Sequence, residues 1–176
     1  MLSDTEKILG FFDEIGLGYR LTPLDDKTFL PGIKIERGEL LIDLARLRYP
    51  GDLLHEAGHI AVTDENARPG LGGDMKHAGH KGGEEMAAIA WSWAALQKIG
   101  LPAEFLFHPD GYRGASATLI EAFADKRGFG YPLLYSWFMC ENPQHPDGYP
   151  KMQHWFRDEA YRQARLGGLK ATVQAD

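Results

Sequence analysis

The hydrophobic residues at the start of the chain recur at the three- and four-residue spacing of one helix face. Ser3 with Glu6 has the form of a capping box, in which each residue satisfies a backbone amide of the other at a helix N-terminus. Gly16 and Gly18 interrupt the pattern. We therefore predict a helix over residues 4–16 that these glycines end.

The pattern then becomes extended, over residues 19–21 and 29–42. In the second stretch the sequences IKIE and ELLI flank Arg37 and Gly38, an arrangement typical of two short strands joined by a tight turn. This part of the chain predicts an antiparallel hairpin.

Helical spacing returns further along, and the expected helices cover residues 52–62, 84–99, 116–126 and 151–165. Asp52 is expected to be the N-cap of the first of these helices. Residues 64–83 are rich in Gly, His and Asp without an apolar period, which predicts a long surface loop. Residues 132–139 are apolar and aromatic, and their pattern fits either a helix or a strand.

These elements predict one α+β domain that is mostly helical, with a short antiparallel sheet or hairpin before the helix over residues 52–62. A chain of 176 residues is long enough for one hydrophobic core and short for two. No repeat or linker divides it, so we treat residues 1–176 as a single domain.

The composition of the chain indicates which partners and which cellular compartment to expect. The net charge of −6 argues against a general nucleic-acid binder, which needs a basic face. No apolar run approaches the length of a membrane span, and the N-terminus lacks the pattern of a signal peptide. The single cysteine, Cys140, can form no internal disulfide, and its apolar surroundings predict a buried structural thiol. We expect a cytoplasmic protein without membrane or nucleic-acid partners.

The sequence DLLHEAGHIAV places His55, Glu56 and His59 within an otherwise apolar helix. This is the HExxH pattern, in which the two histidines lie on one helix face and can reach the same Zn²⁺. Glu56 would lie beside that face, where it could accept a proton from a zinc-activated water. The competing interpretation is a set of hydrogen-bonded core residues that bind no metal.

A catalytic zinc needs a third protein ligand and one open position. The helix that begins GGEEMAAIAWSW offers Glu84 and Glu85. Glu85 shares a helix face with Ala88, Ile89 and Ser92, a stripe of small residues that could pack closely against the HEAGH helix. We therefore favour Glu85 as the third ligand. Glu84, which can complement the helix dipole, is the alternative.

HEAGH followed by a glutamate-led, alanine-rich helix resembles the gluzincin class of zinc metallopeptidases, and more narrowly the ImmA/IrrE-type domain. There a strand, a loop and an HExxH helix precede a helix with a pattern like E-x-x-A-x-x-F-A. Setting Glu85 at the family's glutamate places Ala88 and Trp91 on its alanine and aromatic positions, which supports Glu85 as the ligand. The similarity covers about residues 39–96, and only HExxH is sharply specific.

The resemblance implies a small zincin-like domain, a bound zinc ion and hydrolysis of a peptide bond in a peptide or protein substrate. The metal-site core would span about residues 39–99, followed by a helical, aromatic part over about residues 100–170. The chain departs from the family in its Gly/His-rich loop and in this aromatic C-terminal part.

Other candidate residues are less distinctive. Asp74, His77 and His80 could bind a metal or move over it as a lid, although solvated loop histidines are the commoner case. A hydrolase also needs a donor for the developing oxyanion. The sequence offers four candidates without selecting one: His108, Tyr112, Tyr149 and His154. The four tryptophans are expected to pack in the core or at its edges.

We therefore expect a zinc-dependent hydrolase, a metallopeptidase-like enzyme with His55, His59 and Glu85 as metal ligands and Glu56 as the catalytic base. The alternative is a zinc-stabilised binding or regulatory module without catalysis. In that alternative His77 or His80 would close the fourth position of the metal, and Glu56 would have no role.

Overall fold

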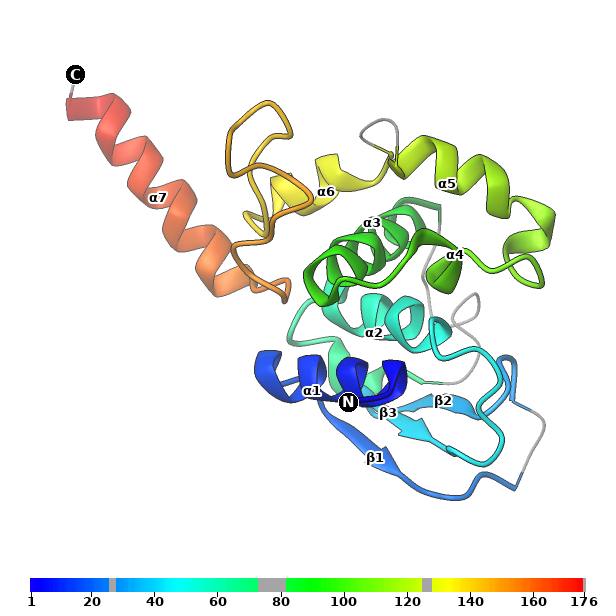
Figure 1. The fold of residues 1–176 in the computed structure, drawn as a ribbon. Helices are drawn as coiled ribbons and strands as arrows, with labels where there is room; N and C mark the ends of the chain where they lie inside the picture. Colours follow the sequence, from blue (N-terminus) through cyan, green and yellow to red (C-terminus); the bar gives the residue numbers. More distant parts are fainter. Residues whose placement is uncertain (26–27, 73–81, 125–127, 176) are drawn as a thin grey trace.

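The computed structural model describes residues 1–25, 28–72, 82–124 and 128–175 (Figure 1). It is a small α+β domain with one three-stranded sheet. The helices and strands follow in this order: α1 (Asp4–Ile15), β1 (Tyr19–Leu21), β2 (Ile33–Glu36), β3 (Glu39–Ile42), α2 (Asp52–Val62), η1 (Arg68–Gly70), α3 (Gly82–Ile99), α4 (Ala103–Leu106), η2 (Tyr112–Gly114), α5 (Ser116–Ala124), α6 (Tyr131–Ser136) and α7 (Glu159–Ala175).

The predicted first helix is confirmed. The Ser3 hydroxyl accepts a hydrogen bond from the Glu6 amide at 3.1 Å, and the Glu6 carboxylate accepts one from the Ser3 amide at 2.7 Å, which completes the capping box. Gly16 ends α1 with a left-handed φ of 77°, a conformation that costs glycine little. The helix packs the side chains of Ile8, Phe11 and Phe12 into the core.

The hairpin is confirmed as well, within a mixed sheet of strand order β1-β3-β2. Strands β2 and β3 pair antiparallel, with Glu36 opposite Glu39, so the connecting turn has two residues. Arg37 and Gly38 both have positive φ, 51° and 76°, the feature of the tight turns whose twist suits a hairpin. Strand β1 adds to β3 in parallel, a pairing that the hairpin prediction lacked.

Helix α3 forms the centre of the fold (Figure 1). Its residues from Ala87 to Leu96 are all buried, because α2 lies on one side and α6 on another. Such a helix is apolar around its circumference. The Trp91 indole N–H donates to the backbone oxygen of Trp155 at 2.8 Å, which attaches the C-terminal segment to this centre. Three tryptophans are buried in the core, as expected, with Trp91 fully buried, and Trp155 is partly buried and packs against it.

The C-terminal prediction is wrong in its boundaries. Residues 151–158 are irregular, and α7 begins at Glu159 and continues to Ala175, ten residues past the expected end at residue 165. The Asp158 carboxylate accepts a hydrogen bond from the Tyr161 amide at 2.9 Å and so acts as an N-cap. Earlier amides have partners elsewhere: those of Gln153 and His154 both donate to the Met139 carbonyl.

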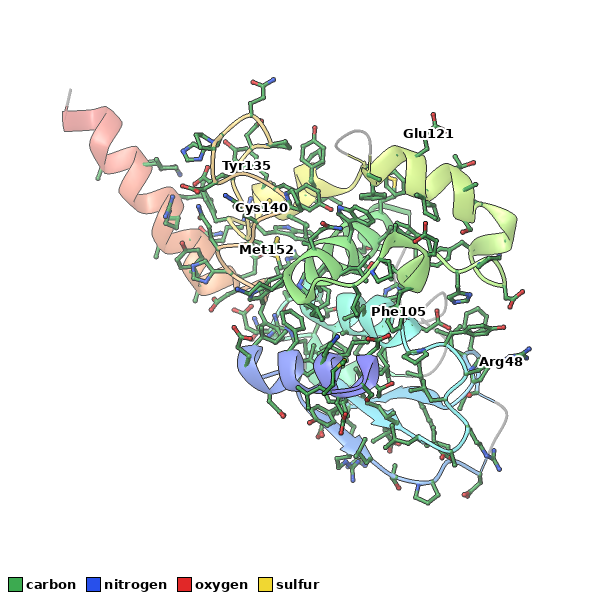
Figure 2. The ribbon with its side chains drawn as sticks, in the orientation of Figure 1. Arg48, Phe105, Glu121, Tyr135, Cys140 and Met152 are labelled. Carbon is green, nitrogen blue, oxygen red and sulfur yellow. The ribbon has the colours of Figure 1, made fainter. Side chains whose placement is uncertain are left out.

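The apolar stretch that fitted helix or strand contains the short helix α6. Cys140 follows it and pairs with Met152 in an isolated β-bridge (Figure 2). Helix α5 agrees with the expected helix as far as Ala124, and residues 125–127 lie outside the described part. Among the described residues, no helix combines the length and apolar character needed to cross a membrane.

The C-terminal segment also holds the end of the HEAGH helix. The Arg157 backbone amide donates to the Ala61 carbonyl at 2.9 Å, and its side chain donates to the Val62 carbonyl at 3.4 Å. Arg68 donates to the Ile60 carbonyl at 3.2 Å. These bonds satisfy carbonyls at the end of α2, so Arg68 and the C-terminal segment both stabilise the end of the HEAGH helix.

Candidate metal centre

Helices α2 and α3 approach closely enough for their backbones to touch. A Cβ atom built on Gly58 would lie 2.6 Å from the carbonyl oxygen of Ala88. No ordinary side chain tolerates that distance, so only glycine permits this approach. Ala88 lies one turn after Glu85, and Gly58 lies between His55 and His59. The contact therefore brings the first turn of α3 beneath the histidines of α2.

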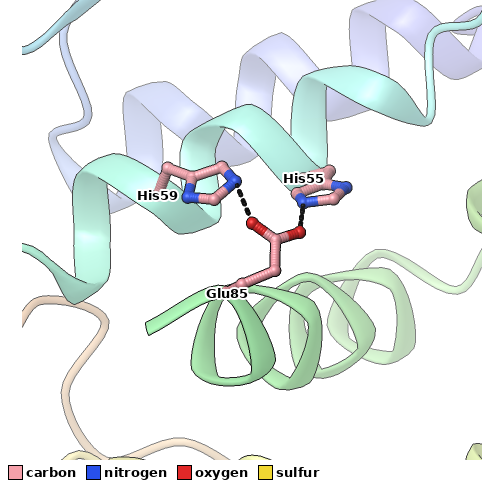
Figure 3. A group of neighbouring side chains, drawn as sticks. All are labelled: His55, His59 and Glu85. Atoms are coloured by element: carbon pink, nitrogen blue, oxygen red, sulfur yellow. Dashed lines mark hydrogen bonds and ion pairs between the residues drawn. The ribbon is translucent and has the colours of Figure 1, made fainter. Parts of the chain in front are cut away.

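The Glu85 carboxylate lies between the two histidines (Figure 3). Its Oε1 atom is 2.9 Å from His55 Nε2, and its Oε2 atom is 3.0 Å from His59 Nε2. One donor atom of each of the three residues lies within 4.8 Å of the others. The two imidazole rings are nearly parallel, with centroids 5.0 Å apart. Glu84 is not part of this group.

Burial and hydrogen bonds shift the pKa values of Glu85 and His55. Burial raises the pKa of Glu85, but the hydrogen bonds from His55 and His59 outweigh it and hold that pKa well below its ordinary value. Burial lowers the pKa of His55, yet the Glu85 hydrogen bond and the charges of Glu56 and Glu85 leave it raised. The carboxylate is therefore anionic, and each of its oxygens lies within hydrogen-bonding distance of one imidazole Nε2 atom.

Glu56 has a different environment on the same helix. Burial raises the pKa of its carboxyl group from 4.5 to about 7, with the negative charge of Glu85 adding to the effect and His55 opposing it. A carboxyl group with a pKa near 7 can accept and return a proton near neutral pH. The residue predicted to be the base therefore has a carboxyl pKa near neutral pH.

The four candidate oxyanion donors have different hydrogen-bond and packing partners. The Tyr112 hydroxyl is 3.2 Å from His55 Nδ1, beside the histidine–glutamate group. The Tyr149 hydroxyl donates to the Ala90 carbonyl at 2.7 Å and is a core hydrogen bond. The His154 ring packs on Tyr161 with centroids 4.0 Å apart. Of these three, only Tyr112 contacts a candidate metal ligand.

The fourth, His108, forms a buried pair with Asp52. Its Nε2 atom is 2.8 Å from Asp52 Oδ1, and Tyr49 stacks on the imidazole with centroids 4.1 Å apart. The expectation that Asp52 caps α2 is wrong: Gly51 occupies the N-cap position, and Asp52 is the first residue of the helix. Its carboxylate turns to His108 because both side chains are buried and the imidazole offers it a hydrogen-bond donor.

The structure tests the prediction for Cys140 but not the prediction for the loop residues Asp74, His77 and His80. Cys140 is 2% exposed, and burial raises the pKa of its thiol to about 12, so the prediction of a structural thiol is confirmed. Asp74, His77 and His80 lie outside the described residues. Of the predicted surface loop, the structure describes residues 64–72, which include the short helix η1, and residues 82–83. The last two already belong to α3, so the predicted end of the loop is two residues too late.

The sequence offers His108 and Tyr112 as candidates but does not indicate that their loop contacts α2. Asp52 lies three residues before His55 and four before Glu56, so helical spacing alone places it on their side. The partners His108 and Tyr112 are more than 50 residues away in sequence, and no local pattern links them to α2.

Comparison of this chain with models of known protein families, with curated proteins and with solved structures gave no match. The chemistry of the site therefore carries the functional argument. Two imidazole nitrogens and one carboxylate, converging from two rigid helices, are the donor types that catalytic zinc sites use. The residues present fit a zinc ion.

Proposed function

We propose that the protein is a zinc-dependent hydrolase that cleaves peptide bonds, within a zincin-like domain. One observation carries the proposal: the two histidines of HEAGH and the carboxylate of Glu85 converge within 4.8 Å. Three such ligands leave one position of a tetrahedral ion open, which distinguishes a catalytic zinc site from a structural one.

His55, His59 and Glu85 would hold the metal through the atoms that now bond to one another. A cation between them would replace the hydrogen bonds of the Glu85 carboxylate with stronger attractions. It would also displace any protons that the two imidazole Nε2 atoms carry, because only the unprotonated nitrogen binds a metal. Zinc in such a site supplies Lewis-acid activation of water and of a substrate carbonyl.

Glu56 would act as the general base. Its carboxyl pKa of about 7 allows it to take a proton from the attacking water and to give one to the leaving amine. A bound cation would favour its ionised form, because nearby positive charge lowers a carboxyl pKa. The chain thus has separate residues for metal binding and for proton transfer.

The compartment we propose is the cytoplasm. Cys140 is the only cysteine of the chain, and a thiol without an internal partner is typical of proteins in a reducing compartment.

The test compares wild-type protein with Glu56→Gln, a change that removes the base and keeps the size of the side chain. Each zinc-loaded protein would be assayed on a fluorogenic peptide library, and its zinc content measured. Glu56→Gln should keep one zinc per chain and lose at least about a hundredfold in cleavage rate. Glu121→Gln, the same change at an exposed position of α5, is the control and should retain full activity.

Cleavage that survives Glu56→Gln would refute the proposed mechanism. A wild-type protein that binds zinc in solution but cleaves no peptide in the library would instead favour the non-catalytic zinc module.

A further inference from the structure

Three side-chain contacts attach the loop over residues 108–114 to the HEAGH helix and to the residues just before it. His108 pairs with Asp52 in the first turn of α2 at 2.8 Å. The Tyr49 hydroxyl, just before α2, donates to Asp110 at 2.7 Å. The third attachment joins Tyr112 to the candidate ligand His55 at 3.2 Å. Three anchors fix this loop relative to the proposed metal site.

The backbone of this loop adopts an uncommon conformation at Tyr112. Tyr112 and Arg113 both have left-handed φ values, 55° and 53°, and Gly114 follows with 80°. Residues with side chains seldom adopt this region, and such outliers persist where the surroundings fix them, often at functional sites. The Tyr112 ring is held on two sides, stacked on His55 at 5.5 Å and edge-on against Phe107 at 5.2 Å.

The hydroxyl of Tyr112 faces the imidazole nitrogen that does not face Glu85. His55 Nε2 points at the Glu85 carboxylate, and Nδ1 points at the Tyr112 oxygen. When Nε2–H donates to the Glu85 carboxylate, a neutral His55 accepts the Tyr112 O–H at Nδ1. In a metal-bound site Nε2 must present its lone pair, and the proton of the neutral ring then lies on Nδ1.

A hydroxyl suits both situations, because it can donate a hydrogen bond or accept one. A carboxylate or carbonyl in its place could only accept, and would favour one tautomer alone. Histidines that bind metals almost always donate their second N–H to an outer partner, which fixes the ring and its tautomer.

We propose that Tyr112 is a positioning residue of the metal site. Its hydroxyl accepts the Nδ1–H of metal-bound His55 and so holds Nε2 toward the metal. This inference rests on the proposed function, because it assigns a role to Tyr112 only if His55 binds a metal.

The test is a zinc dissociation constant, measured by competition with a chromophoric chelator, for wild type, Tyr112→Phe and Tyr149→Phe. Phenylalanine keeps the ring stacked on His55 and removes only the hydroxyl. Tyr112→Phe should weaken zinc binding about 10- to 100-fold, the usual effect of losing such an outer partner. Tyr149→Phe is the matched control, since it also removes one phenol hydrogen bond, to the Ala90 carbonyl, away from His55. It should leave zinc affinity within about twofold.

A second measurement separates positioning from general destabilisation. In zinc-loaded protein labelled with ¹⁵N-histidine, the Nδ1–H of His55 should give a proton signal protected from exchange, and Tyr112→Phe should lose that protection. Equal zinc affinity in wild type and Tyr112→Phe would overturn the role of Tyr112 and leave the metal site standing. Equal weakening by both tyrosine variants would also overturn it. A wild-type protein that binds no zinc would overturn the proposed function and this inference together.

Discussion

The carbonyl oxygen of Ala88 lies 2.6 Å from where a Cβ atom on Gly58 would be. This contact sets the closest approach of α2 and α3. It lies between the two histidines on one helix and one turn after Glu85 on the other. Because Gly58 has no side chain, the two helices can lie this close together. Their short separation allows the Glu85 carboxylate to reach both imidazoles.

Gly58→Ala should separate the two helices and damage the site. The added methyl group overlaps backbone rather than a movable side chain, so we expect a loss of about 1–3 kcal/mol in the free energy of unfolding and weaker zinc binding. Denaturant titration and chelator competition measure the two effects. Gly10→Ala is the control: Gly10 is exposed within α1, and no atom lies within 4 Å of an added Cβ. That change should stabilise the protein by about 0.5–1 kcal/mol. A Gly58→Ala protein as stable as Gly10→Ala would contradict the account of this contact.

The stability of the metal-free protein should fall as pH rises from about 4.5 to about 7. The folded pKa of Glu56, about 7, exceeds its ordinary value of 4.5. A raised carboxyl pKa means that the folded state holds its proton more tightly than the unfolded state does, so this contribution is complete below pH 4.5 and lost as pH approaches 7. It amounts to at most about 3.5 kcal/mol, at roughly 1.4 kcal/mol per pKa unit.

Unfolding free energies of wild type and Glu56→Gln, measured in the presence of a chelator at pH 5 and pH 7.5, test this dependence. The amide does not titrate, so the variant should lose less stability than wild type between the two pH values. An identical pH dependence in both proteins would show that Glu56 is not buried in the way described.

The attachment of α7 should weaken in acid. The Glu65 carboxylate accepts hydrogen bonds from the Glu159 amide at 2.9 Å and the Ala160 amide at 3.4 Å, at the first turn of that helix. The Glu159 hydrogen bond is the largest cause that lowers the pKa of Glu65 below 4.5. Its stabilising effect is therefore present above pH 4.5 and is lost as pH falls through the lowered value. Amide hydrogen exchange at Glu159 should quicken in Glu65→Ala at neutral pH. Unchanged protection there would contradict the role of Glu65 as an anchor.

Cys140 should react with thiol reagents only after the protein opens. It is 2% exposed, and its thiol pKa near 12 leaves almost no thiolate at neutral pH. Labelling by a disulfide reagent should follow the rate of unfolding and accelerate with denaturant. Rapid stoichiometric labelling of the native protein would contradict the burial of this residue.

Local sequence signals predicted the first helix, the hairpin and the close packing of Glu85 on HEAGH. The capping box of Ser3 and Glu6 and the Arg37-Gly38 turn act over a few residues, so a reader of the sequence can find them. The small-residue face that begins at Glu85 indicated which of two adjacent glutamates would lie toward the histidines.

Other features depend on contacts between distant segments. The carboxylate of Asp52 turns from capping to His108, 56 residues away. Residues 151–158 have the composition of a helix, yet the amides of Gln153, His154 and Arg157 bond to carbonyls of Met139 and Ala61 instead. Tertiary hydrogen bonds outweigh helix propensity there, and the sequence holds no local sign of them.

The measurement that tests the central claim most directly is the metal content of untagged protein purified without chelators, for wild type, Glu85→Ala and Glu84→Ala. Glu84 is the matched control, because it lies in the first turn of the same helix and is not part of the group formed by His55, His59 and Glu85. We predict one zinc per chain in wild type and in Glu84→Ala, and loss of zinc in Glu85→Ala. A wild-type protein that carries no metal, even after zinc is added, would contradict the account, and the HEAGH motif would then be a hydrogen-bonded part of the core.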